Sequence, residues 1–253
     1  MELELWQFAV LFAAAFFGGF IDSIAGGGGL ISLPALLAVG VPPHVAIATN
    51  RFQGSFGSFT AALNFIRKGY VDAAEILCGV IFTFIGGLVG AYVLLLVDAK
   101  FLNYLIPILL LALLLYMIFS PNLGEAPAKP KMSKKSFYAI FGLVLGFYDG
   151  FFGPGTGSFW TFALVGILGL YMKKAVAHTK VLNFTSNIVS LGVFIIGGQI
   201  LWLVGAVMAV GQIAGSFAGS SLVMRCDVKF VRKMLLFVVA ATILKLLYGL
   251  IAS

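Results

Sequence analysis

Two carboxylates stand beside glycine clusters in a chain that is otherwise strongly apolar. Asp22 precedes four glycines at 26–29, and Asp149 precedes the segment GPGTG at 153–157. An ionised carboxylate deep in a membrane is costly, so its usual role is in an ion or proton pathway. Both acids are therefore candidates for proton coupling and for a substrate site. The structural alternative is that each acid accepts hydrogen bonds from backbone N–H groups where the helix is interrupted, or caps the next helix.

The glycine clusters themselves are candidates for binding an anion. Each precedes a short apolar segment, and the first N–H groups of a helix form a natural anion site. Close packing between helices explains glycines equally well. With the two acids, the candidate substrate-binding residues in these segments are Ser23, Gly26, Gly27, Gly28, Gly29, Gly153, Gly155, Thr156 and Gly157.

Two cations occupy matching positions in the two halves of the chain. Arg51 and Lys180 are 129 positions apart, each inside an apolar segment. They would neutralise an anionic substrate or pair with Asp149 and Asp22. The alternative is that each reaches the lipid headgroups from near the start of its helix.

Uncharged polar residues accompany these cations. Asn50 adjoins the arginine, and His178, Asn183 and Asn187 surround the lysine in sequence. Such residues commonly hold membrane helices together, and they would equally suit the wall of a substrate cavity. We include all four as candidate substrate-binding residues, although His178 has the character of a hydrogen-bonded interior residue rather than a metal ligand.

Composition places the chain in a membrane. It is 61% hydrophobic and 10% charged, against roughly 25% charged residues in soluble domains. Apolar runs long enough to cross a hydrocarbon core of about 30 Å recur, the clearest at 73–97, 101–119, 200–224 and 230–251. The prediction is an all-α polytopic membrane protein. The net charge of +7 comes mostly from short loops, which indicates topology signals and no nucleic-acid partner.

The sequence contains no pattern typical of an enzyme. It has no paired nucleophile and base, no phosphate-binding loop and no cluster of metal ligands. Cys78 and Cys226 lie far apart without metal-ligand spacing. We therefore expect no catalytic residues, no metal and no cofactor.

The chain is an internal duplication. At an offset of 129, AIATNR at 46–51 aligns with AVAHTK at 175–180, and DAKF at 98–101 aligns with DVKF at 227–230. Gly86 and Gly90 align with Gly215 and Gly219, a spacing that lets helices approach closely. The expected organisation is a first membrane repeat at 1–120, a linker at 121–136 and a second repeat at 137–253. Together they form one transmembrane domain.

Each repeat is expected to contain a broken hairpin followed by three transmembrane helices. In the first repeat the hairpin consists of segments 5–22 and 30–39, and the next helix covers 44–66. A ten-residue segment is too short to cross a bilayer as a helix. The whole chain would then have eight to ten membrane segments.

Loop charges predict that the two repeats have opposite orientations. In repeat one, the basic residues at 67–68 follow the helix expected at 44–66. In repeat two, the basic residues at 173–174 precede the corresponding helix, and further basic residues occupy the linker. Placing basic loops in the cytoplasm puts the linker inside and both termini outside. Lys100 is the exception. Inverted repeats of this kind are common in secondary transporters.

The chain resembles the TauE/SafE family of sulfite and organosulfonate exporters, and more narrowly its YfcA-like bacterial inner-membrane branch. The motifs that carry the resemblance are GFIDSIAGGGG at 19–29, ATN at 48–50, GFYDGFFGP at 146–154, AHTKVLN at 177–183 and TSN at 185–187. The resemblance spans essentially the whole chain. It implies a multi-pass transporter in the bacterial inner membrane whose substrate is a small anion, sulfite or a small organosulfonate.

The expected function is outward transport of such an anion by alternating access between the repeats. Its partners would be the small anionic substrate and the lipid bilayer, with a homo-oligomer as a further possibility. Two alternatives stay open: a gated anion channel, and a transporter of an unrelated small solute.

Overall fold

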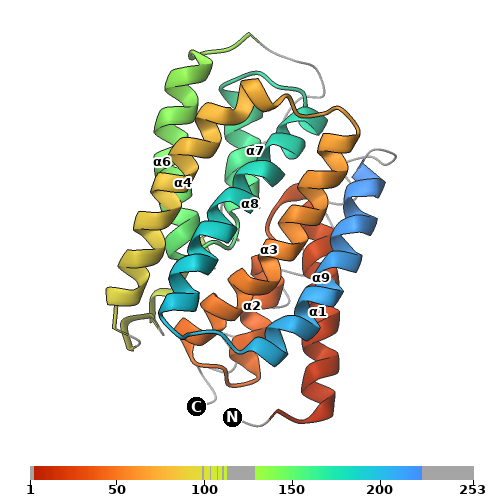
Figure 1. Cartoon of the computed structure of the whole chain (residues 1–253), viewed down its shortest axis with the longest axis vertical. Helices are drawn as coiled ribbons and strands as arrows, with labels where there is room; N and C mark the ends of the chain where they lie inside the picture. The colour runs from red at the N-terminus through yellow and green to blue at the C-terminus, as the bar shows by residue number, and fades with distance from the viewer. Residues whose placement is uncertain are drawn as a thin grey trace.

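The protein is helical throughout the described part of the computed structural model, which covers residues 3–98, 129–223 and most positions between 100 and 112. Figure 1 shows long and short helices packed together. In chain order they are α1 (Leu5–Ala25), α2 (Gly29–Ala38), α3 (Pro43–Arg67), α4 (Ala73–Leu96), α6 (Lys134–Phe151), α7 (Thr156–Gly166), α8 (Met172–Ile196) and α9 (Trp202–Val223).

The predicted segments at 5–22, 30–39, 44–66, 73–97 and 200–224 correspond to the helices α1, α2, α3, α4 and α9. Within the described residues, four helices are long and apolar enough to cross a membrane: Leu5–Ile24, Ala73–Leu96, Met172–Ile196 and Trp202–Val223. The segment predicted at 230–251, most of 101–119, the first part of the linker and Cys226 lie outside the described residues. Since α3 carries the polar residues of the centre of the protein, it has the length of a span without the matching apolar composition.

The long helices form two groups of three. In the first bundle α9 packs against both α1 and α3, and in the second bundle α4 packs against both α6 and α8. The two bundles meet where α3 packs against α8. In Figure 1, α1, α3 and α9 run upward from their N-termini, and α4, α6 and α8 run downward. Each bundle thus combines helices from both halves of the sequence.

Glycines allow the closest helix contacts inside each bundle. A Cβ atom built on Gly215 would lie 1.9 Å from the carbonyl oxygen of Phe16, and one on Gly219 would lie 2.2 Å from that of Phe20. In the second bundle, the same construction on Gly90 comes 2.1 Å from the carbonyl oxygen of Phe147. The small-residue spacing in the sequence therefore marks the α1–α9 and α4–α6 interfaces, where backbone meets backbone.

Gly215→Ala is expected to lower the stability of the protein clearly, because the obstructing atom belongs to the backbone of α1 and cannot rotate away. Forcing a methyl group into a packed interface costs about 1–3 kcal/mol. The measurement is the thermal unfolding midpoint in detergent. Gly192→Ala in α8 is the matched control, because its added Cβ meets nothing within 4 Å. Equal midpoints for the two variants would contradict the assigned interface.

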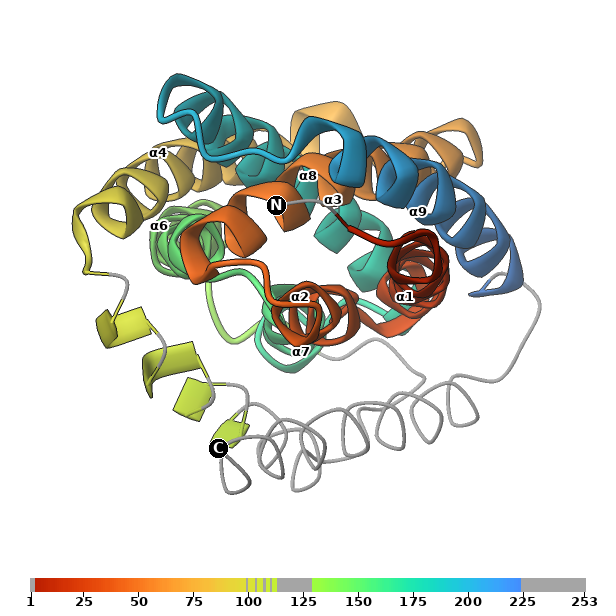
Figure 2. The same cartoon turned by 90° about the horizontal axis from the view of Figure 1, so that it is seen from below.

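The short helices α2 and α7 are half-length elements in the middle of the protein. Helix α2 is ten residues long and ends before Gly40, whose φ is +86°, while Pro43 sets the start of α3. Helix α7 follows Gly155, which has a left-handed conformation. Figure 1 and the view from below in Figure 2 place α2 and α7 one above the other. Their broken ends meet near the centre, where Ser158 donates a hydrogen bond to the Gly26 carbonyl oxygen over 3.2 Å.

Candidate functional site

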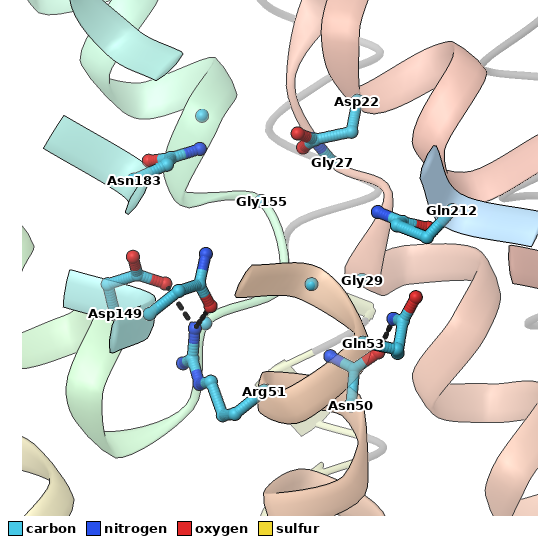
Figure 3. A pocket seen from close by; sticks show the side chains of 14 residues that line it. Asp22, Gly27, Gly29, Asn50, Arg51, Gln53, Asp149, Gly155, Asn183 and Gln212 are labelled. Carbon is cyan, nitrogen blue, oxygen red and sulfur yellow. Dashed lines mark hydrogen bonds and ion pairs between the residues drawn. The ribbon is translucent and has the colours of Figure 1, made fainter. Parts of the chain in front are cut away.

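A small polar cavity lies where the two broken ends meet the central helices. Its volume is about 40 Å³, which is room for roughly three water molecules or a few heavy atoms of a ligand. Figure 3 shows its charged and amide side chains converging from α1, α3, α6, α8 and α9, while the segments beside α2 and α7 contribute glycines. The lining residues are Asp22, Gly27, Gly29, Asn50, Arg51, Gln53, Gly54, Asp149, Gly153, Gly155, Gly157, Asn183, Asn187 and Gln212.

Arg51 forms a buried ion pair across the two bundles. Its Nη1 atom lies 2.8 Å from Asp149 Oδ1, and the two side chains are 4% and 3% exposed. The same nitrogen donates to Asn187 Oδ1 over 2.9 Å. Thr156 donates to Asp149 Oδ1 over 3.1 Å, and Ser186 donates to Asp149 Oδ2. These hydrogen bonds hold the carboxylate between α6, α7 and α8 (Figure 3).

Lys180 forms the corresponding pair with Asp22. Its Nζ atom lies 2.9 Å from Asp22 Oδ2 and also donates to the backbone carbonyl of Asp22. The lysine side chain is fully buried, whereas that of Asp22 is 15% exposed. In both pairs the cation belongs to one half of the sequence and the acid to the other half. The snorkelling alternative is therefore wrong for both cations, because each finds its counter-ion in the interior.

Asp22 also fixes the broken end of the first hairpin. Its Oδ1 atom accepts hydrogen bonds from the backbone N–H groups of Gly27 at 3.1 Å and Gly28 at 3.3 Å. These are the donors that the sequence offered to an anionic ligand. At this helix start a carboxylate of the protein takes the place of the anion, so the structural role proposed for Asp22 as an alternative is present.

Five buried polar atoms of cavity residues have no hydrogen-bond partner within the described residues. Two are donors, Nε and Nη2 of Arg51, and three are acceptors, the side-chain oxygens of Gln53, Asn183 and Gln212. Unsatisfied buried groups are rare in native interiors, and each one left unpaired costs roughly 1–3 kcal/mol. The gathering of these unpaired atoms around one cavity suits a binding site for a polar ligand. The ligand would offer hydrogen-bond acceptors to Arg51 and donors to the amide oxygens.

Charge at this site is balanced. The two cations Arg51 and Lys180 face the two carboxylates Asp149 and Asp22, so the formal sum is zero. An added anion would therefore leave an excess negative charge in a buried region, which is unfavourable unless a compensating positive charge accompanies it. A proton taken up by one of the carboxylates is the smallest such charge.

Eleven of the seventeen predicted site residues line the cavity, and six do not. Lys180 and Thr156 act one step away, through the two acids. Gly26 and Gly28 shape the broken hairpin, and Ser23 is buried beside them. His178 lies elsewhere, fully buried with its Nδ1 atom 2.8 Å from the hydroxyl of Tyr138.

Four contributors to the site lie outside the seventeen predicted residues. Gln53, Gly54 and Gln212 line the cavity, and Ser186 bonds Asp149. Gln53 and Ser186 belong to the polar stretches of the central helices, so their polarity was a usable signal. Gln212 had a signal too, because it is a lone amide in the apolar helix α9. The contribution of Gly54 could not be read from the sequence, since it depends on which face of α3 turns toward α8.

Comparison with known proteins identifies relatives that are membrane transporters. The family profile described as "Sulfite exporter TauE/SafE" matches residues 11–246. A probable membrane transporter protein of Haemophilus influenzae is 42% identical over 252 residues, covering 98% of this chain and 97% of that protein. The probable membrane transporter protein YfcA of Escherichia coli K12 is 45% identical over 239 residues, covering 94% and 89%. A more distant relative, the probable membrane transporter protein YunE of Bacillus subtilis, is 24% identical over 243 residues, covering 85% and 88%.

No solved structure shows a significant match to the chain. The family profile and the relatives nevertheless agree with each other over almost the full length. They confirm the resemblance drawn from the glycine and polar motifs, and they confirm the predicted class, which is a transporter and not an enzyme. The chain belongs to the TauE/SafE family of membrane transporters.

Proposed function

We propose that this protein moves a small anion, sulfite or a small organosulfonate, outward across the bacterial inner membrane by alternating access between two inverted repeats. The observation that carries the proposal is the cavity at the junction of the two bundles, where two guanidinium nitrogens of Arg51, Nε and Nη2, have no hydrogen-bond partner within the described residues. A planar guanidinium suits the oxygens of sulfite and sulfonate groups well.

The arrangement of the helices supports the alternating-access part of the proposal. Corresponding helices of the two halves run in opposite directions in Figure 1, and contacts between halves occur in matched pairs, α1 with α9 and α4 with α6. A site at the junction of such repeats would open to one side or the other as one bundle rocks against its partner. The first bundle and the second bundle are the natural moving units.

We further propose that transport is coupled to a proton carried by Asp149, with Asp22 as the second candidate. The balanced charge of the site is the support, because an anion bound at Arg51 competes with Asp149 for the same guanidinium. Protonation of that carboxylate would free the guanidinium for the substrate. The alternative is uniport without a proton, in which the interior-negative membrane potential would drive the anion outward with about 2.3 kcal/mol per charge per 100 mV.

The proposed orientation keeps the linker in the cytoplasm and both termini outside. In Figure 1 the end of α3 and the starts of α4, α6 and α8 lie together at the upper end of the protein. Arg67, Lys134 and Lys174 therefore gather at one side. Such a concentration of basic residues is typical of the cytoplasmic face.

Sulfite flux in proteoliposomes tests the proposal. We expect saturable sulfite transport by the wild-type protein that Arg51→Ala abolishes and that Arg67→Ala, an exposed arginine at the end of the same helix, leaves unchanged. Chloride and an amino acid serve as control solutes. Flux that rises linearly with concentration would indicate a channel instead. Absence of sulfite and sulfonate flux in a folded protein would overturn the assigned substrate class.

A further inference from the structure

A second polar site lies at one end of the protein, away from the central cavity. It is an open cleft of about 570 Å³ at the end where α4, α6 and α8 begin. The charged and aromatic residues that line it are Asp72, Glu75, Lys134, Lys135, Tyr138 and Lys174. Three lysines from two helices therefore converge on one cleft that plays no part in the central cavity.

The lysines retain donors that the protein does not use. Glu75 Oε1 lies 2.5 Å from Lys134 Nζ, and Glu75 Oε2 lies 2.7 Å from Lys174 Nζ, so one carboxylate joins α4, α6 and α8. An ammonium group has three N–H donors, and Lys134 and Lys174 each give one of them to Glu75. Lys134 is 58% exposed, and Lys135 adds a third ammonium group whose side chain contacts no acid within the described residues. The other acid of the cleft, Asp72, is occupied in capping α4 through Ala74 N–H.

Further along the two helices that form most of the cleft, exposed side chains are apolar. On α4, Leu77 is 58% exposed and Ile81 50%, and on α6 Ile140 is 51% exposed and Val144 59%. In a membrane transporter such side chains face lipid acyl chains. The same two helices thus carry a cationic cleft near their starts and hydrocarbon-facing side chains further along. Charged residues followed by apolar residues along the same helices match a lipid with a charged head and apolar tails more closely than a soluble anion.

The three lysines of the cleft have no charged counterparts in the other half of the sequence. The glycine motifs that begin at Gly19 and Gly146 are 127 positions apart, and at this offset Lys134 and Lys135 correspond to Gln7 and Phe8. At the offset of 129 that applies after these motifs, Lys174 corresponds to Val45. These positions are uncharged. The duplicated fold therefore does not require the lysines, and their presence on one side would select the lipids of one leaflet.

We propose that this cleft binds the phosphate of an anionic glycerophospholipid, such as phosphatidylglycerol, with its acyl chains lying along α4 and α6. Lys134 and Lys135 would contact the phosphate, and Lys174 would remain anchored to Glu75 beside it. Because Glu75 bridges three helices of the second bundle, lipid binding at this point would also stabilise that bundle as a unit.

The test measures binding of short-chain phosphatidylglycerol to the purified protein by native mass spectrometry, with thermal unfolding as a second readout. The Lys134→Gln/Lys135→Gln variant should bind about 30-fold more weakly. The control is Lys68→Gln/Lys131→Gln, which removes the same charge from exposed positions at the same end. Both variants change exposed side chains, so the fold is expected to persist.

Three outcomes would overturn the proposal. Equal weakening in the two double variants would mean that binding follows overall charge. Equal affinity for phosphatidylcholine would mean that the phosphate is not recognised as part of an anionic headgroup. If inorganic phosphate raised the unfolding midpoint as much as phosphatidylglycerol does, the cleft would be assigned to a soluble anion instead of a lipid.

Discussion

Asp149→Asn is expected to abolish transport and to lower the thermal stability of a protein that still folds. The substitution removes the negative charge that faces Arg51 in a pair whose side chains are 4% and 3% exposed. Breaking one partner of a buried ion pair typically costs about 3–5 kcal/mol, because the other charge stays buried without compensation. Proton coupling through this position is lost at the same time.

The decisive measurement is the response of the variant to an anion. Methanesulfonate keeps its charge across the neutral pH range, so its effect on the unfolding midpoint reports the protein. In wild type we expect stabilisation that grows as pH falls, since a proton must accompany the anion. In Asp149→Asn the anion replaces the missing carboxylate, and stabilisation should be larger and independent of pH. Absence of this difference would remove Asp149 from the coupling mechanism.

Two further variants locate the effect. Asp98→Asn, an exposed acid that caps the backbone at Lys100 over 2.7 Å, should behave as wild type in transport. Asp22→Asn should also stop transport but cost less stability. Its side chain is 15% exposed, and the amide oxygen of Asn can still accept the bonds from Gly27 and Gly28. If the two buried acids gave identical stability losses, the burial argument that separates them would be wrong.

Gly26→Ala is expected to have the largest effect on the folded structure itself. Gly26 ends α1 with φ 75° and ψ 151°, a region of backbone conformation that is essentially confined to glycine. An added Cβ would also lie 2.3 Å from the carbonyl carbon of Gly157 and 2.4 Å from the nitrogen of Ser158. Since these are backbone atoms of the opposite broken hairpin, the junction of the two halves would have to separate.

The expected cost is about 3 kcal/mol or more, combining backbone strain with overpacking. Gly40→Ala separates the two causes, because Gly40 also has a positive φ, +86°, but its added Cβ meets nothing within 4 Å. It should lose only about 1–2 kcal/mol. Unfolding midpoints and sulfite flux of the two variants provide the comparison. A Gly26→Ala protein as stable and active as Gly40→Ala would mean that the two broken ends are not in contact.

The sequence alone determined the helical membrane class, the duplication and most of the residues of the central cavity. The reason is that these properties are written in local patterns. The length of the apolar runs determines the membrane spans. Helix-breaking glycines determine where α1 ends and where α7 begins, and proline and glycine determine the turn between α2 and α3. Acids and cations inside apolar segments are conspicuous because they are costly there.

Only the tertiary structure decided how the charges are paired. Arg51 and Asp149 are 98 positions apart, and Lys180 and Asp22 are 158 apart, so no local pattern relates them. Close backbone contact along α1–α9 and α4–α6 places α3 against α8, and this packing brings each cation to the acid of the other half. The sequence thus supplied two acids and two cations, and packing between the bundles, which depends on shape over long sequence separations, turned them into one neutral site.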